Sequence, residues 1–256
     1  MAIVTDITPD LEAAFANAKL VALDIEGVNL GRSGKISLVQ IATGERCFLL
    51  DLLEHDAFTP LVAWLRRLLE SPRVLKIIHD CRRDSDALKH LLGISLQHVH
   101  DTSCWHYCIR RQQDASLNHV LEANGMRPNA VRDPNVYAQN HAFWATRPLT
   151  RRMIDWASGD VTCMFQLYAL QVAEASDPAA REAALLSETF LNIGRLAKVE
   201  SIAPARIGAL IGHKGCNIRA LQRRTNTLIY PKGSEVVVYY HDDAGLREVL
   251  RSANKC

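Results

Sequence analysis

"KLVALDIEGVNL", residues 19–30, is the stretch from which the fold of this chain can be read. Its apolar run is typical of a buried strand, and the run ends in two carboxylates, Asp24 and Glu26. Side chains two residues apart on a strand point to the same face, so these two repel each other unless a cation lies between them. The other interpretation is a turn cap beside a solvated acid, and acids elsewhere in the chain must decide between the two.

Apolar runs and helical periodicity continue outward from this stretch. Three further runs favour strands: "KISLVQIA" (35–42), "CFLLDL" (47–52) and "RVLKIIH" (73–79). Helical periodicity predicts helices within 8–18, 59–70, 84–92, 116–125 and along the whole of 150–175. Strands interleaved with helices predict an α/β fold.

Composition and cysteine usage limit the class of protein. A chain of 256 residues with 48% hydrophobic content can bury one or two sizeable cores. The seven cysteines lack a framework spacing and no signal peptide is evident, so we expect an intracellular protein that is not secreted. No apolar run approaches the roughly 20 residues that cross a bilayer, so we expect no membrane partner.

Charge divides the chain into two modules. Residues 186–256 hold eleven Lys/Arg against six Asp/Glu, whereas the rest holds nineteen against 22. A basic tail predicts an anionic partner for the second module. We expect a first domain at 1–180, a connecting helix at 181–196 and a second domain at 197–256, with "SDPAARE" (176–182) as the linker candidate.

Two more acids carry the argument about the first module. In "KIIHDCRRDSDALKHLL" (76–92), Asp80 and Asp84 lie one helical turn apart and Asp86 points elsewhere. Asp80 is explained by a cap at the start of a helix. Asp160 lies among the apolar residues of a predicted helix, where a carboxylate is costly unless it is paired or bound to a metal.

These four acids together resemble a known family. Asp24 and Glu26 in "LDIEG", Asp84 in "HDCRRDSDAL" and Asp160 in "WASGDV" follow the order and spacing of the DEDD exonucleases. The resemblance is to the RNase D-like group, covers about 18–172, and implies an RNase H-like fold, a mixed sheet with flanking helices. It implies hydrolysis of single strands from the 3′ end with two Mg²⁺ or Mn²⁺ ions. Asp24 would bridge both ions, Glu26 and Asp160 would complete one site, and Asp84 would hold the second ion through a water.

One position departs from the family pattern. The RNase D-like group has a Tyr four residues before the last Asp, and another subgroup has a His five residues before it; here these positions hold Trp156 and Asp155. An indole N–H donates a hydrogen bond but cannot accept the proton of the attacking water. We therefore expect either a slower exonuclease or, as the alternative, a catalytically silent adaptor that binds RNA. A chain whose modules bind a protein partner is disfavoured by the four ordered acids.

The second module resembles a KH domain. "ALIGHKGCNIRAL" (209–221) carries the I-G-x-x-G-x-x-I pattern, and the surrounding periodicity predicts an α+β unit of order βααββα. Glycines at a turn let the backbone approach a sugar-phosphate chain, although a plain helix–turn–helix corner also explains them. The residues expected to bind the strand are Gly212, His213, Lys214, Gly215, Arg219 and Arg223.

The pairing of the two modules predicts the substrate. A KH groove holds about four unpaired nucleotides, so tethering it beside an exonuclease raises the local concentration of single strands. The pairing resembles exonuclease–KH proteins predicted in plants and algae. We predict a metal-dependent 3′–5′ exonuclease acting on single-stranded RNA, with single-stranded DNA as the alternative strand.

Overall fold

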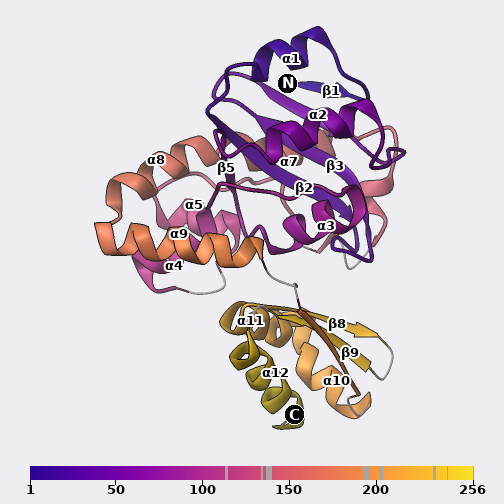
Figure 1. Ribbon diagram of the computed structural model, residues 1–256, viewed down its shortest axis with the longest axis vertical. Coiled ribbons are helices and arrows are strands. Elements are labelled where there is room, and N and C mark those ends of the chain that lie inside the picture. Colours follow the sequence, from indigo (N-terminus) through magenta and orange to yellow (C-terminus); the bar gives the residue numbers. More distant parts are fainter. Residues whose placement is uncertain are drawn as a thin grey trace.

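The computed structural model describes residues 1–112, 115–133, 135–136, 140–192, 196–201, 204–232, 235–240 and 242–255, and they form two units (Figure 1). The first unit contains a six-stranded sheet of order β1-β4-β3-β2-β5-β6. Its strands are β1 (Ala2–Val4), β2 (Leu20–Val28), β3 (Lys35–Ala42), β4 (Cys47–Asp51), β5 (Leu75–Ile78) and β6 (Val99–Asp101). β3 is antiparallel to β2 and β4, whereas the other three pairings are parallel.

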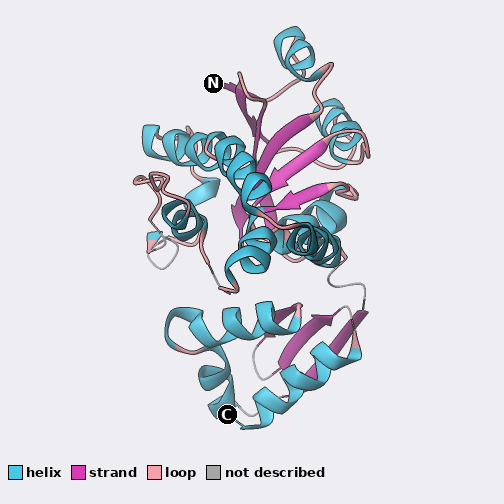
Figure 2. Cartoon of the chain, turned by 90° about the vertical axis from the view of Figure 1, so that its left-hand side faces the viewer, coloured by secondary structure: helices cyan, strands magenta, loops and turns pink. Residues whose placement is uncertain are grey.

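Helices cover both faces of this mixed sheet (Figure 2). The helical elements are α1 (Pro9–Phe15), α2 (Pro60–Leu69), α3 (Arg82–Leu92), α4 (Thr102–Arg110), α5 (Leu117–Ala123), η1 (Phe143–Ala145), α7 (Arg151–Thr162), α8 (Met164–Glu174) and α9 (Asp177–Leu191). This arrangement confirms the expected α/β fold with flanking helices.

Alternate side chains of β2 belong to two different hydrophobic cores. Val21, Leu23 and Ile25 pack in one core with α1, α2 and α3, whereas Ala22 belongs to the other core with α5, α7 and α8. Asp24 lies two residues beyond Ala22 and therefore points toward the face that α7 covers. The strand keeps this alternation through Glu26, and its register with β3 shifts only after that residue.

Two helical segments differ from their expected form. The stretch 150–175 is two helices, because α7 ends before Cys163 and α8 begins after it. The helix expected at 181–196 spans Asp177–Leu191, since Ser176 stands at its N-cap position and a Pro follows in the first turn. Phe190 joins the core of the first unit. We propose accordingly that the domain boundary falls between α9 and the next strand.

The second unit has the expected βααββα order. Its elements are β7 (Leu196–Ser201), α10 (Pro204–Ile211), η2 (His213–Gly215), α11 (Cys216–Thr225), β8 (Thr227–Lys232), β9 (Glu235–Tyr240) and α12 (Asp243–Lys255). The three strands form an antiparallel sheet of order β7-β9-β8, which packs against the helices. Within the described ranges of both units, no helix combines the length and apolarity that a bilayer crossing requires.

Candidate functional site

Three carboxylates converge where β2 meets α7. Asp24 and Glu26 come from the end of β2 and Asp160 from the last turn and a half of α7, and one oxygen from each lies within 4.8 Å of the others. Glu26 is buried, and Asp160 is fully buried at 0% exposure. We call Asp24, Glu26 and Asp160 the carboxylate cluster. The structure thus brings together three of the four acids that the sequence singled out.

Burial disfavours the charged forms of Asp24 and Asp160. Burial, followed by the negative charge of Asp160, raises the pKa of Asp24 to about 7. Burial also raises the pKa of Asp160, although Arg132 and two hydrogen-bond donors act in the opposite direction. Three oxygen ligands that repel one another are the type of donor set that Mg²⁺ and Mn²⁺ prefer. The residues present therefore fit a divalent cation.

Asp84 lies close to the cluster but outside the group of three. It is buried in the first turn of α3, and burial raises its pKa well above the usual range, with Asp24 as the next cause. Asp80 is not the helix cap that we expected: it forms an ion pair with Arg82, whose Nε lies 2.6 Å from Asp80 Oδ1, and Cys81 occupies the N-cap position. The participation of Asp84 in metal binding stays a prediction.

Three donors hold the carboxylate of Asp160. Asn129 Nδ2 donates to Oδ1 over 2.8 Å, and Arg132 donates to Oδ2 over 2.7 Å. Trp156 Nε1 also donates to Oδ2, over 3.0 Å. Gly159 permits this arrangement, because a Cβ at that position would lie 2.7 Å from Asn129 Nδ2. Sequence reasoning missed Asn129 and Arg132, and the glycine beside Asp160 was the one local signal of a close approach.

Trp156 is fixed within an aromatic group as well as by its hydrogen bond. Its ring lies 5.5 Å from that of Trp144 and 5.9 Å from that of Phe143, and the side chain is 1% exposed. The indole stands one helical turn before Asp160, so its N–H reaches the carboxylate along the helix. Trp156 is therefore placed to orient the carboxylate of Asp160.

Gln40 is a buried polar neighbour that the sequence did not indicate. It stands directly opposite Asp24 in the β2–β3 ladder, and residues paired in this way project to the same face. Its side chain is fully buried, and neither amide atom has a hydrogen-bond partner among the described residues. A buried amide without partners is costly, so Gln40 marks a place where a bound ligand or water belongs.

The glycine turn of the second unit has the backbone that its sequence predicts. Gly212 and Gly215 have φ values of 71° and 77°, a region that side chains disfavour. His213 and Arg219 are exposed beside the turn, where a phosphate chain can reach them. The side chains of Lys214 and Arg223 lie outside the described part of the chain.

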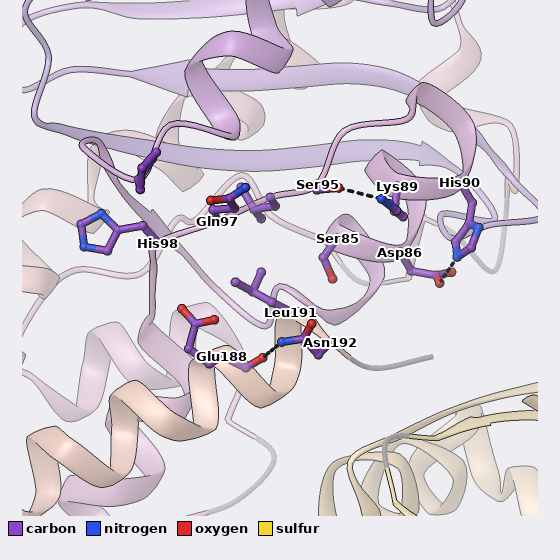
Figure 3. Close-up of a pocket in the computed structure, with 12 residues that line it drawn as sticks. Ser85, Asp86, Lys89, His90, Ser95, Gln97, His98, Glu188, Leu191 and Asn192 are labelled. Atoms are coloured by element: carbon purple, nitrogen blue, oxygen red, sulfur yellow. Dashed lines mark hydrogen bonds and ion pairs between the residues drawn. The ribbon is translucent and has the colours of Figure 1, made fainter. Parts of the chain in front are cut away.

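A cavity lies away from the carboxylate cluster, between α3 and α9 (Figure 3). It measures ≈ 780 Å³, and its walls include Lys89, His90 and Glu188. The carboxylate cluster is not among its lining residues. Cavity size therefore does not identify the site in this protein, and the convergence of carboxylates does.

Comparison with known proteins agrees with both units. A family model described as a 3′–5′ exonuclease matches residues 5–170, and one described as a KH domain matches residues 198–243. The chain is 28% identical over 199 residues to mouse piRNA biogenesis protein EXD1, covering 72% of this chain and 34% of that protein. It is 33% identical over 172 residues to Haemophilus influenzae ribonuclease D, covering 65% and 40%. The chain thus spans about a third to two fifths of these relatives.

Solved structures share the fold of the first unit. The Trypanosoma brucei RNase D complex with RNA U12 is 25% identical, with a TM-score of 0.61, covering 74% of this chain and 69% of that one. Brucella melitensis NrnC with bound Mg²⁺ is 22% identical, with a TM-score of 0.61, covering 74% and 89%.

Proposed function

Because this chain belongs to the 3′–5′ exonuclease family and carries a KH domain, we propose that it is a metal-dependent exoribonuclease whose KH domain holds the single strand. The convergence of Asp24, Glu26 and Asp160 within 4.8 Å carries this proposal. RNA is favoured over DNA because ribonuclease D is a relative and a related structure contains RNA.

The carboxylate cluster would hold two Mg²⁺ or Mn²⁺ ions. When bound, such ions supply a water of lowered pKa and compensate the charge on the leaving oxygen. Asp24 would be shared between them, Glu26 and Asp160 would complete one site, and Asp84 would support the other through a water. Asn129 and the indole of Trp156 keep Asp160 in one orientation. The Asp160 side chain would therefore lose little conformational entropy when the metal binds.

The KH domain would bind the strand away from the cluster. At the glycine turn, Gly212 and Gly215 expose their backbone, and positive side chains such as Arg219 favour phosphate. A groove of this kind holds about four unpaired nucleotides, and this binding does not depend on cleavage of the strand. The strand would therefore stay bound while its 3′ end is shortened.

A silent RNA-binding adaptor is the second candidate, and the contact of Trp156 favours it. The single polar atom of this side chain is a donor, and it is 3.0 Å from Asp160 Oδ2. Trp156 therefore offers the attacking water no proton acceptor. In the adaptor, the exonuclease fold would serve as a scaffold for RNA binding.

A cleavage time course separates the two candidates. A 5′-labelled single-stranded RNA, and DNA of the same sequence, would be incubated with Mg²⁺, Mn²⁺ or EDTA. We expect a ladder that shortens from the 3′ end, disappears in EDTA and in Asp24→Ala, and persists in Asp56→Ala, an exposed acid used as the matched control. Cleavage that survives in Asp24→Ala would contradict the metal assignment.

The same time course tests the adaptor. Wild-type protein that binds RNA but yields no ladder would favour it. Recovery of cleavage in Trp156→Tyr would then show that the missing proton acceptor at this position causes the defect.

A further inference from the structure

The two units touch through the outer face of the KH sheet. In β9, Val236 and Val238 pack toward the helices of the KH domain. Successive side chains of a strand point to opposite faces, so Tyr239 faces away from these helices. The guanidinium of Arg32 lies 3.4 Å from the centroid of the Tyr239 ring. On β8, the ring of Tyr230 lies 5.2 Å from the guanidinium of Arg83. In Figure 1 the KH domain accordingly lies below α3.

A buried ion pair anchors this contact on the exonuclease side. Asp86 on α3 accepts from Arg32 through Nε over 3.0 Å, through the guanidinium NH2 over 2.6 Å and through the backbone N over 2.8 Å. Tyr230 Oη lies 3.5 Å from Asp86 Oδ2, and a Cβ at Gly31 would collide with that hydroxyl. An arginine stacked on the face of an aromatic ring is attracted to it, and this attraction strengthens as water is excluded. We call Arg32, Asp86, Tyr230 and Tyr239 the interdomain contact.

Helix α11, which follows the glycine turn, shares a small cavity with the start of α3. A Cβ at Gly215 would lie 2.7 Å from a guanidinium nitrogen of Arg219, so Arg219 adjoins the turn. Arg219 also borders a small cavity, of ≈ 60 Å³, whose other lining residues come from both units: Asp80, Arg82, Arg83, Gln222 and Leu228. Arg83 directly precedes Asp84 in the first turn of α3. Arg219, next to the glycine turn, and Arg83, next in sequence to Asp84, therefore line the same small cavity.

The charges of Arg83 and Arg219, beside the small cavity, favour the binding of a polyanion. Arg83 and Arg219 are exposed, and neither forms an ion pair with a carboxylate of the described residues. By contrast, Arg82 is buried and paired with Asp80. Two exposed guanidinium groups, one from each unit, can each bind a phosphate oxygen of a chain that crosses from one unit to the other.

We propose that Arg83 and Arg219 form a phosphate-binding bridge along which a single strand passes from the KH turn to the carboxylate cluster. The inference rests on the proposed function, which supplies single-stranded nucleic acid as the occupant. A strand of four nucleotides occupies only the KH groove, whereas a longer strand also contacts Arg83 in the bridge. The bridge makes affinity depend on strand length, and Arg83 contributes to it only for strands that leave the groove.

Binding by the full-length protein tests the bridge. Fluorescence anisotropy in EDTA, which prevents cleavage, would use 5′-fluorescein oligouridylates of about 4 and 12 nucleotides, because the KH groove alone accounts for about four. We expect Arg83→Ala to weaken binding of the longer strand roughly fivefold and to leave the shorter one unchanged. The slope of log affinity against log salt should fall by about 0.7 for one lost phosphate contact.

A matched variant controls for the loss of charge. Like Arg83, Arg46 carries its guanidinium near an aromatic ring, that of Phe48, but this contact and its ion pair with Asp10 lie within the exonuclease unit. Arg46→Ala should leave both affinities unchanged. An Arg83→Ala protein that loses no more affinity than Arg46→Ala would overturn the bridge, and so would a wild-type protein that gains nothing between the two lengths.

The interdomain contact has its own readout. Tyr239→Ala should abolish the gain in affinity between the shorter and the longer strand, and it should increase the radius of gyration in small-angle scattering. Tyr239→Phe should keep the affinity gain and the radius of gyration of the wild type. Unchanged scattering and binding in Tyr239→Ala would overturn the docking on which the bridge depends. These measurements need no cleavage, so a protein without nuclease activity would contradict the proposed function and leave this test intact.

Discussion

Replacement of Trp156 by phenylalanine should weaken metal binding at the carboxylate cluster. The substitution removes the indole N–H that donates to Asp160 Oδ2 over 3.0 Å and keeps an aromatic ring beside Trp144 and Phe143. A hydrogen bond to a charged acceptor contributes roughly 1.5–3 kcal/mol. The bond also opposes the rise in the pKa of Asp160 that burial causes, so without it the carboxylate holds its proton to higher pH.

The expected size of the effect follows from the role of the indole as a support for a ligand. Loss of a group that orients a metal ligand typically costs 10- to 100-fold in metal affinity. At about 1.4 kcal/mol for each factor of ten, this range agrees with the value of the hydrogen bond. The affinity of Trp156→Phe for Mn²⁺ should therefore fall by one to two orders of magnitude at neutral pH, and part of the loss should be recovered as the pH is raised.

Calorimetric titration with Mn²⁺ at several pH values would measure this change. Trp64→Phe is the matched control, because Trp64 is also a buried indole, packed 5.5 Å from Phe15 in the other core of the same unit. Circular dichroism would verify that both variants remain folded. If Trp156→Phe bound Mn²⁺ as tightly as wild type at every pH, the indole would have no part in orienting Asp160 and the reasoning would be refuted.

Three further predictions concern the cluster and the turn. Gly159→Ala should lower Mn²⁺ affinity in the same titration, since the added Cβ would displace the amide that holds Asp160; an unchanged affinity would contradict this. In EDTA, thermal stability should fall as the pH rises from about 4 to 7, because the folded state keeps the proton of Asp24, with a pKa of about 7, after the unfolded state has lost it. Mg²⁺ should reduce that fall, and melting curves with and without the ion would check it. Gly215→Asp should weaken RNA binding at least tenfold in anisotropy and leave Mn²⁺ titration unaltered, because φ is 77° and the added carboxylate would lie beside Arg219 and repel phosphate.

The sequence predicted the orientation of the two strand acids because β2 is regular where they lie. Asp24 and Glu26 share a face as long as the strand alternates, and the register shift comes after Glu26. A bulge one or two residues earlier would have turned one carboxylate into the opposite core. The periodicity of the apolar run could not by itself show where the bulge falls.

Periodicity was less informative about where helices end. The stretch 150–175 was predicted as continuous, and the interruption at Cys163 has neither Pro nor Gly to indicate it. Asp160 lies before the interruption, so its predicted place on the helix was unaffected. The start of α9 was missed for a different reason: Ser176 and the following Pro were interpreted as a linker, although the same residues are typical of a helix N-terminus.

The supports of Asp160 could not be predicted from local pattern. Asn129 and Arg132 lie between α5 and η1, in a segment without helical or strand periodicity, and they reach Asp160 across about 30 residues of sequence. Such contacts depend on how a loop folds back onto a helix. The same holds for the interdomain contact, in which Arg32 meets Tyr239 from the opposite end of the chain.

Helix α3 carries residues of both the carboxylate cluster's surroundings and the interdomain contact. Asp84 lies close to the carboxylate cluster, and Asp86, two residues later and therefore on another side of the helix, holds Arg32 against Tyr239 of the KH domain. Arg83 lies between them, next to the small cavity that both units line. Because one helix carries all three side chains, a KH domain docked on Arg32 lies beside the surface that borders the cluster. This is the physical reason to expect strand binding and strand shortening to depend on each other more than a flexible tether would require.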